Sequence, residues 1–334
     1  MMRLLLSPMV QSCRPLLWLW LCLLVILTSL WTRPVTAAEE MPRLSISVLQ
    51  FGTAHWELDH LQRAGLDRAE GFELEVRLVA NLPASRLAVS SGDVEGAVAD
   101  LLWAQARYEA GDPFTYLPFS SQIGDILVAP ESGIRQVSDL VGQRIGVAGG
   151  PDSKGWILLE QVARRQGIDL ASQASVQYAA PPLLSQALVR DQVDVLVTYW
   201  HFAARLRADG DARTAFRMED LLAALDFDPN LPVLGYVFRA DWAQAHPDLL
   251  ARFHRALNTA KTQLASSPEH WQALRPLMRA DDDAIFAQLR DGFIEGTPAP
   301  LTPERIEDLQ RLLALAGTDE GRVMPSALFY RPGP

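Results

Sequence analysis

A glycine-rich segment in the middle of the chain has the residue types of a site that could hold an anion. An apolar run at residues 144–147 leads to Gly149 and Gly150, and a helix is predicted to begin at Ser153. Glycine permits backbone angles that are closed to other residues, and the first amides of a helix have no acceptor within it. Those amides lie at the positive end of the helix dipole, where a negative group is stabilised. Lys154 is either a counter-ion for such a group or a solvated residue at the helix start.

Four tryptophans stand in comparable positions, each shortly after a predicted strand: Trp56, Trp103, Trp156 and Trp200. Ligands of parallel α/β sheets bind beyond the carboxyl ends of the strands. A single tryptophan at a helix start is as often a packing residue as a ligand contact. Four in equivalent loops favour an aromatic wall in a cleft, which would suit a heterocycle, an alkyl chain or an ammonium group.

Further residues at the same predicted edge complete the candidate site. Asp100 ends an apolar strand, so its carboxylate could accept hydrogen bonds from a ligand or cap the helix that follows. His201 has the same two alternatives, a ligand contact or a helix cap. The remaining candidates for ligand binding are Phe51, Gly52, His55, Ser120, Ser121 and Tyr199.

The common motifs of catalytic and metal sites are missing from the sequence. There is no Gly-x-Ser-x-Gly elbow, the 6 histidines show no His-Glu-x-x-His spacing, and the residues after Gly150 break the phosphate-loop pattern. Both cysteines, Cys13 and Cys22, lie near the N-terminus, so the rest of the chain has neither a thiolate nucleophile nor a disulfide. We therefore expect no enzyme activity, no cofactor and no metal.

Residues 1–38 have the pattern of an export signal peptide. Arg3 and Arg14 flank the start, residues 16–30 are apolar, and small residues at 35–38 suit a peptidase. A membrane anchor is the alternative, but an apolar core of roughly 15 residues is shorter than the ~20 that span a bilayer. We expect a periplasmic protein.

The chain is acidic, with a formal net charge of −10 over 334 residues. Loss of residues 1–38 removes three arginines and no acid, which leaves 27 basic against 40 acidic residues and a net charge of −13. Nucleic-acid binding is disfavoured for such a protein. An anionic ligand would have to be held by local amides and a few placed cations, because the overall field repels it.

Short apolar strands alternate with helices along the first part of the chain. Strands are predicted at 44–49, 73–79, 94–99, 126–128, 144–147, 175–178 and 193–197, and helices at 56–69, 83–90, 101–110, 153–166 and 182–190. This alternation predicts parallel α/β sheets with helices on both faces. After residues 234–238 the chain becomes nearly all helical, with helices at 247–265, 281–294 and 304–316.

Four segments, in this order along the chain, resemble one protein family: residues 91–100, 126–134, 137–156 and 192–200. They are similar to the periplasmic solute-binding proteins of ABC importers, in the branch that takes nitrate, taurine, aliphatic sulfonates and thiamine-pyrimidine precursors. The resemblance covers most of the chain after residue 38. It implies the two-lobed type II periplasmic binding protein fold, in which each lobe is a mainly parallel sheet flanked by helices.

The same resemblance implies that the chain crosses between the lobes twice, near residues 120–128 and 232–238. The first lobe would combine residues 39–122 with 236–334, and the second would hold residues 123–235. A ligand would bind in the cleft between them, with hinge closure around it.

The function implied by the resemblance is that of the periplasmic substrate-binding component of an ABC transporter, acting as a monomer. It would capture a small organic solute, such as a sulfonate, a taurine-like compound or a pyrimidine or other heterocycle, and deliver it to an inner-membrane permease. One alternative is a sensor or helper subunit of a periplasmic enzyme system. Another is an enzyme on the same fold, whose turnover would depend on His55 or His201.

Overall fold

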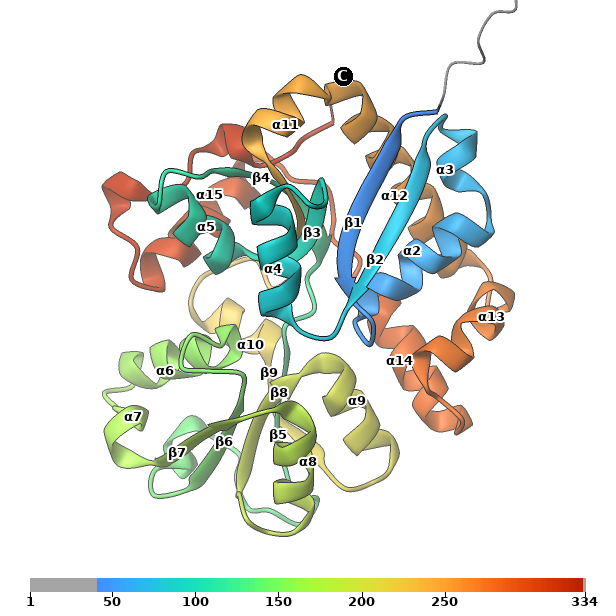
Figure 1. Ribbon diagram of the computed structural model, residues 1–334. Coiled ribbons are helices and arrows are strands. Elements are labelled where there is room, and N and C mark those ends of the chain that lie inside the picture. Colours follow the sequence, from blue (N-terminus) through green and yellow to red (C-terminus); the bar gives the residue numbers. More distant parts are fainter. Residues whose placement is uncertain (1–40, 333–334) are drawn as a thin grey trace, which may run out of the picture. The chain divides into compact units, whose positions relative to one another are not determined.

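Two five-stranded sheets organise the computed structural model of this protein, which describes residues 41–332 (Figure 1). The strand order in the first sheet is β2 (Glu73–Val79), β1 (Arg43–Leu49), β3 (Gly96–Asp100), β10 (Leu234–Arg239) and β4 (Phe114–Ser120). The order in the second sheet is β7 (Ser175–Ala179), β6 (Arg144–Ala148), β8 (Val195–Tyr199), β5 (Gly124–Val128) and β9 (Arg213–Arg217). The signal peptide predicted for residues 1–38 lies outside the described residues.

Each sheet has a parallel part and an antiparallel part. In the first sheet β1 pairs in parallel with β2 and β3, and in the second β6 pairs in parallel with β7 and β8. The strands β10 and β5 are antiparallel to both of their neighbours. The chain enters the second sheet at β5 and returns to the first at β10. The two-sheet α/β fold predicted from the sequence is confirmed, with the antiparallel pairings confined to these two strands.

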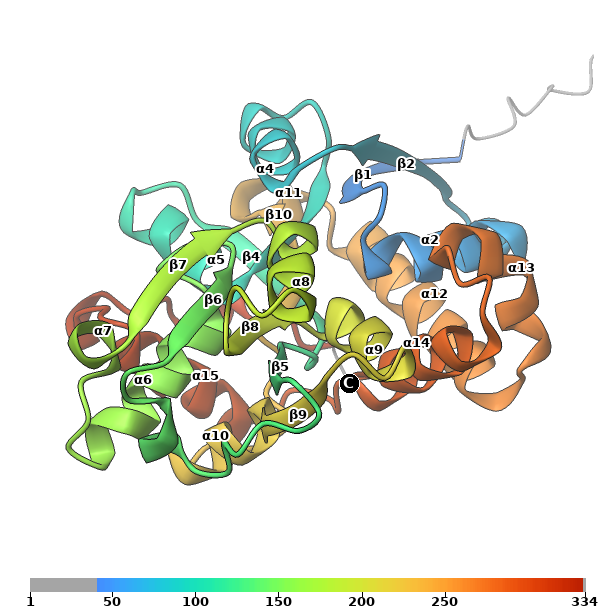
Figure 2. The same ribbon diagram turned by 90° about the horizontal axis from the view of Figure 1, so that it is seen from below.

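Helices connect the strands and cover the sheets (Figures 1 and 2). Between the strands lie α2 (Thr53–Arg63), α3 (Leu66–Ala69), α4 (Leu82–Ser91), α5 (Leu101–Glu109), α6 (Lys154–Arg165), α7 (Leu170–Gln173), α8 (Pro181–Val189), α9 (Trp200–Ala208) and α10 (Met218–Ala224). After β10 come α11 (Ala240–Ala245), α12 (Pro247–Ser266), α13 (Glu269–Met278), α14 (Asp283–Glu295) and α15 (Pro303–Leu315). No helix within residues 41–332 combines the length and the apolar character needed to cross a membrane.

The edge strands β4 and β9 are elements that the sequence pattern does not predict. Pro118 lies inside β4, and a proline is tolerated in a strand at a sheet edge, where its missing amide leaves no neighbouring strand unpaired. The strand β9 begins and ends with arginine and is partly exposed along its length. Gly65, in the left-handed conformation with φ of 66°, divides the predicted helix 56–69 into α2 and α3.

The hydrophobic core joins the two sheets. One cluster of buried side chains includes Ala97 and Val237 of the first sheet together with Ile126 and Val147 of the second. Another cluster lies between the first sheet and helices α2, α12, α13 and α14, and it includes Trp200 of α9. Packing therefore connects the two halves of the fold in addition to the two chain crossings.

Candidate functional site

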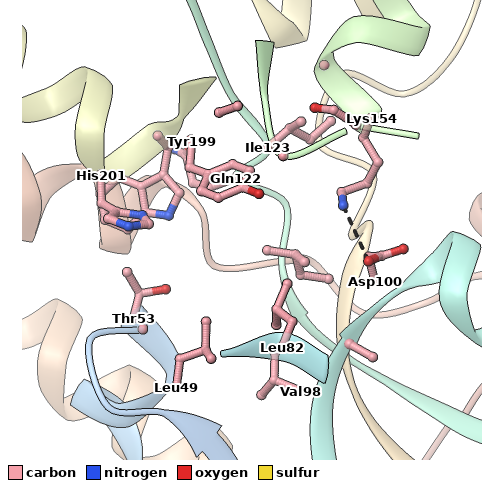
Figure 3. Close-up of a pocket in the computed structure, with 18 of the residues that line it drawn as sticks. Leu49, Thr53, Leu82, Val98, Asp100, Gln122, Ile123, Lys154, Tyr199 and His201 are labelled. Atoms are coloured by element: carbon pink, nitrogen blue, oxygen red, sulfur yellow. Dashed lines mark ion pairs between the residues drawn. The ribbon is translucent and has the colours of Figure 1, made fainter. Parts of the chain in front are cut away.

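A cavity of about 450 Å³ lies between the two sheets. Its lining comes from the carboxyl ends of β1, β3, β6 and β8 and from the first turns of α2, α4, α6 and α9. Gln122 and Ile123 on the first chain crossing also line the cavity, as do Phe119, Met218 and Leu234. Figure 3 shows Lys154 and Tyr199 of the second sheet facing residues of the first sheet across the cavity. Parallel strands present their carboxyl ends at one edge of a sheet, which explains why these loops meet here.

Three helices begin at the cavity without a side-chain cap. The N-cap residues are Gly52 for α2, Ser153 for α6 and Tyr199 for α9, and the side chain of none of them makes a capping hydrogen bond. By contrast, the side chains of Asn81 and Asp100 cap α4 and α5. The first amides of a helix have no acceptor within it. Three sets of N–H groups and three positive dipole ends therefore border one cavity.

Asp100 and Lys154 meet across the cavity from different sheets (Figure 3). Asp100 is the last residue of β3 and Lys154 the first of α6, and Lys154 Nζ lies 3.7 Å from Asp100 Oδ2. The same carboxylate accepts hydrogen bonds from the Arg86 guanidinium at 2.8 Å and from the Trp103 amide at 3.0 Å. Burial by itself would raise the pKa of Asp100, but Lys154, the Trp103 amide and Arg86 together outweigh it and hold the pKa below its ordinary value. Asp100 is therefore ionised at neutral pH.

Arg86 and Lys154 are the lysine and arginine side chains of the described residues that line the cavity. Arg86 is engaged by Asp100 and also lies over the indole ring of Trp103, 5.8 Å from its centroid. Lys154 makes the longer contact with Asp100, and its side chain is 21% exposed. Arg86 lies closer to the same carboxylate, at 2.8 Å, so Lys154 is the cation with more freedom to turn toward a ligand.

Much of the remaining lining is apolar (Figure 3). Leu49, Leu82 and Val98 belong to the side of the first sheet, Ile123 to the crossing, and Met218 to the start of α10. Cavities that bind small organic molecules combine such walls with a few placed polar groups. The arrangement suits a ligand that carries both a charged group and an apolar part.

Tyr199 and His201 form an aromatic side of the cavity. Burial, with a smaller contribution from Arg205, lowers the pKa of His201 to about 4, so the imidazole is neutral at physiological pH. A Cβ atom on Gly149 would lie 3.0 Å from the hydroxyl oxygen of Tyr199, and Gly149 has a φ of +95°. Both the backbone angle and the neighbouring phenol therefore favour glycine at this position.

The predicted ligand-binding residues divide into two groups. Those that line the cavity are Gly52, Asp100, Gly149, Gly150, Ser153, Lys154, Tyr199, Trp200 and His201. They lie at the carboxyl ends of strands or on the first residues of the helices that follow. Their contact with a ligand stays a prediction, but the fold brings all of them to one cavity.

The predicted wall of four tryptophans is wrong, because Trp56, Trp103 and Trp156 do not line the cavity. Trp56 and Trp156 are core residues with 3% and 1% of their surface exposed, and Trp103 packs against Phe114. These three stand third or fourth in their helices, whereas Trp200 is the first residue of α9. A helix turns by about 100° per residue, so the third side chain points away from the first, which explains Trp103 and Trp156. Trp56 is fourth, on nearly the same side as the first residue of α2, and its ring packs in the core against Trp200 and Trp271.

Phe51 and His55 lie beside the cavity without lining it. Phe51 is 49% exposed, and the guanidinium of Arg279 lies over its ring at 3.8 Å from the centroid. The Nδ1 atom of His55 is 3.2 Å from the carbonyl oxygen of Gln50. The structure therefore gives Phe51 a contact with the end of α13 and His55 a contact within the β1–α2 loop, and neither residue lines the cavity.

Ser120 and Ser121 also do not line the cavity. Ser121 donates to the carbonyl oxygen of Gly296 from its amide at 3.0 Å and from its hydroxyl at 3.2 Å. The hydroxyl oxygen of Ser120 accepts a hydrogen bond from the Gln122 amide at 3.1 Å. Both serines therefore make hydrogen bonds that hold the crossing segment. Gln122 and Ile123, the next two residues, line the cavity in their place.

Residues of α4 line the cavity although the sequence analysis does not select them. They are Leu82, Pro83 and Arg86, together with the buried Ser85. The helix follows the parallel strand β2, so the rule that ligands bind beyond the carboxyl ends of strands would have found it. Met218 had no such indication, because it follows the unpredicted strand β9.

Carboxylates are few at this site. Asp100 and Asp152 line the cavity, and Asp100 is already paired with two cations. Within residues 41–332, no group of three or more His, Cys, Asp or Glu could hold a metal ion.

Two α/β sheets with a ligand-sized cavity between them, joined by two chain crossings, define a two-lobed binding-protein fold. Residues 68–271 match the family described as NMT1/THI5 like, and the chain belongs to this family. The matched region includes α4, β3, the first crossing and the segment from Gly149 to Lys154. A search of curated protein sequences finds no match.

Solved structures of binding proteins share the fold. The alkanesulfonate-binding protein SsuA from Xanthomonas axonopodis pv. citri, bound to MOPS, has a TM-score of 0.66 at 20% identity over 88% of this chain and 100% of that chain. The periplasmic aliphatic sulphonate binding protein SsuA from Escherichia coli has a TM-score of 0.65 at 19% identity over 82% of this chain and 91% of that chain. The periplasmic nitrate-binding protein NrtA from Synechocystis PCC 6803 has a TM-score of 0.55 at 14% identity over 75% of this chain and 70% of that chain. At these identities the likeness establishes the fold alone.

Proposed function

We propose that this protein is the solute-binding component of an ABC import system and that it captures a small organic anion between its two sheets. The observation that carries the proposal is the convergence of three uncapped helix N-termini and Lys154 on one cavity with apolar walls. Uncapped amides stabilise negative charge without a full cation. The apolar walls would receive the remainder of the molecule.

The charge around the cavity differs from the charge of the whole chain. The protein has a formal net charge of −10, so its long-range field repels anions. Around the cavity, however, the charges of Arg86 and Lys154 are balanced by those of Asp100 and Asp152. The attraction for an anion would then come from the three uncapped helix N-termini that border the cavity.

A sulfonate with an organic substituent is the ligand class we favour, followed by taurine-like compounds and by pyrimidines or other heterocycles. The cavity of about 450 Å³ has more room than an inorganic anion fills. One solved structure of the same fold is that of an alkanesulfonate-binding protein bound to MOPS. MOPS combines a sulfonate, a short alkyl chain and a heterocycle, which are the parts that this cavity suits.

The transport role follows from the same proposal. In it, lobe 1 consists of residues 39–122 and 236–334 and lobe 2 of residues 123–235, and closure of the lobes presents the loaded protein to an inner-membrane permease. The protein would act in the periplasm as a monomer after export by residues 1–38. Another solved structure of this fold is a ligand-binding component of an ABC-type import system from Staphylococcus aureus, with a TM-score of 0.66 at 14% identity. No bond is made or broken in this function.

Calorimetry and thermal unfolding on residues 39–334 test the ligand class. The compounds are MOPS, taurine, an aminopyrimidine and nitrate, with native mass spectrometry of gently purified protein to detect a co-purified molecule. We expect MOPS to bind and to raise the melting temperature, since a ligand of the folded state stabilises it by mass action. Absence of binding by every compound, with no co-purified molecule, would contradict the proposal and favour a sensor or helper subunit.

A further inference from the structure

Trp200 belongs to the second sheet by sequence but packs in the core of the first. It is the first residue of α9 and directly follows β8 of the second sheet. Its indole is only 6% exposed and belongs to the hydrophobic cluster of the first sheet. The ring lies edge-to-face with that of Trp56 on α2, with centroids 6.0 Å apart and planes at 82°. The residue therefore spans from the cavity wall of one half of the fold to the core of the other.

Gly292 of α14 provides the space that this ring occupies. A Cβ atom on Gly292 would lie 2.9 Å from Cζ3 and 3.1 Å from Cε3 of Trp200. Contacts below 3.0 Å do not occur for real Cβ atoms, so any side chain at 292 would displace the indole. Glycine inside a helix is unfavourable relative to alanine, which makes close packing against Trp200 the physical reason for glycine here.

A second contact holds α9 against the helices that follow β10. The guanidinium of Arg205, on α9, donates hydrogen bonds to the carbonyl oxygens of Met278 at 2.5 Å and Arg279 at 3.0 Å. Both acceptors lie at the C-terminal end of α13, where unpaired carbonyls favour a cation. Figures 1 and 2 both show α9 beside α14, in agreement with the residue contacts between these helices.

We infer that Gly292 is a positioning residue: it seats Trp200 and thereby fixes the cavity wall formed by residues 199–201 against the first sheet. Trp200 and His201 line the cavity, and Figure 3 shows His201 opposite Thr53 and Leu49. A shift of the indole moves its chain neighbours, because Tyr199, Trp200 and His201 are consecutive. The role in ligand binding rests on the proposed function, whereas the seating of α9 does not.

The helix α9 packs against both halves of the fold. Ala203 and Leu206 belong to a buried cluster with Leu127 and Leu196 of the second sheet, whereas Trp200 contacts Gly292 of α14 and Arg205 binds the end of α13. Relative motion of the two sheets would have to keep α9 on α14 or break these contacts.

A double-mutant cycle tests the inference. The proteins are the wild type, Gly292→Ala, Trp200→Phe and the double variant, with Gln288→Ala on the exposed face of α14 as the control for helix propensity. The measurements are hydrogen exchange of peptides covering residues 195–208, with residues 247–266 as reference, and calorimetric binding of MOPS. A cycle of this kind isolates the interaction between the two positions.

We expect Gly292→Ala to speed exchange in the α9 peptide and to weaken MOPS binding by about tenfold. The control should change neither. The smaller ring of Trp200→Phe should remove much of the effect of Gly292→Ala, so that the double variant resembles Trp200→Phe alone. Additive effects of the two substitutions, or a Gly292→Ala protein that behaves like the control, would overturn the inference.

The remaining outcomes also decide the question. If the wild type does not bind MOPS, the proposed ligand class fails, but the exchange cycle still decides whether Gly292 seats α9. If Gly292→Ala does not fold while the double variant does, the coupling is demonstrated. If neither folds, the smaller ring gives no relief and the inference is refuted.

Discussion

Lys154 Nζ lies 3.7 Å from Asp100 Oδ2, and this ion pair joins the second sheet to the first across the candidate cavity. Asp100 also caps α5 and binds Arg86, so its position is well determined. Within residues 41–332 Lys154 pairs with no second carboxylate, and it begins the uncapped helix α6. An anion at the start of α6 would compete with Asp100 for the same ammonium group. The pair is therefore the contact that a ligand would change first.

Substitution of Lys154 by methionine should weaken binding of an anionic ligand. The methionine keeps most of the length of the side chain and removes the charge. Hydrogen bonds to charged groups contribute about 1.5–3 kcal/mol, so we expect affinity for MOPS to fall by about 10- to 100-fold. Isothermal titration calorimetry measures the change.

Arg164→Met is the matched control for that loss of charge. Arg164 lies on the same helix, but its side chain is 53% exposed and it pairs with Glu160 four residues earlier. Its removal changes the net charge by the same amount without touching the cavity. Equal affinity losses in the two variants would mean that only the overall charge matters and that Lys154 has no local role.

Alanine at Gly149 should disturb both the backbone and the site. Gly149 has a φ of +95°, and its added Cβ would meet the Tyr199 hydroxyl at 3.0 Å. We expect a loss of about 1 kcal/mol in the free energy of unfolding from the left-handed backbone. MOPS affinity should fall as well, because Tyr199 must move.

Gly142→Ala separates the two effects of Gly149→Ala. Gly142 has a φ of +79°, and an added Cβ there would meet no atom within 4 Å. It carries the same kind of backbone strain at a distance from the cavity. Denaturant unfolding should show similar losses for both variants, and ligand titration should show a loss only for Gly149→Ala. An unchanged affinity in Gly149→Ala would rule out a role for the glycine loop in binding.

The two tryptophans Trp156 and Trp200 should respond differently to truncation. Trp156 is 1% exposed and belongs to the core under α6, so Trp156→Ala should cost about 3–5 kcal/mol in the free energy of unfolding. Trp156→Phe should bind MOPS normally, because residue 156 does not line the cavity. Trp200→Phe should weaken binding, since Trp200 does line it. Calorimetry on the two phenylalanine variants compares them directly, and weaker binding by Trp156→Phe than by Trp200→Phe would show that the cavity lining is assigned incorrectly.

Stability should fall with acidification through the titration of His201. Burial lowers the folded-state pKa of His201 to about 4, whereas an unfolded histidine has a pKa of about 6.5. Between these values the unfolded state binds the proton first, so stability is lost as the pH falls from about 6.5 to about 4. We expect a loss of about 2–3 kcal/mol from this residue.

Comparison with His201→Asn isolates that contribution. Burial also lowers the pKa values of His60 and His254, so they add to the pH dependence in the same direction. Denaturant midpoints at several pH values should decline less steeply in the variant than in the wild type. Identical slopes in the two proteins would mean that His201 is accessible enough to keep its ordinary pKa.

Local patterns predicted much of the fold and part of the site. The alternation of apolar runs with helix starts indicated the strands β1, β2, β6 and β8, and it placed the loops that follow β1, β3, β6 and β8 at one edge. The cavity-lining residues Asp100, Lys154 and His201 come from these loops. The edge strand β9 escaped prediction because it is partly exposed and has no continuous apolar pattern, and β4 because Pro118 interrupts its apolar run.

The sequence by itself determined which residues stand at the carboxyl ends of strands, because that depends on periodicity and on turn-forming glycines. Only the tertiary structure decided which of them face the cavity. Trp156 and Trp200 occupy comparable loops, yet one or two residues of difference within a helix direct their rings to different surroundings. The contact of Trp200 with Gly292 depends on the packing of helices far apart in the chain. No local sequence pattern around either residue predicts this contact, because it forms only when α14 packs against α9.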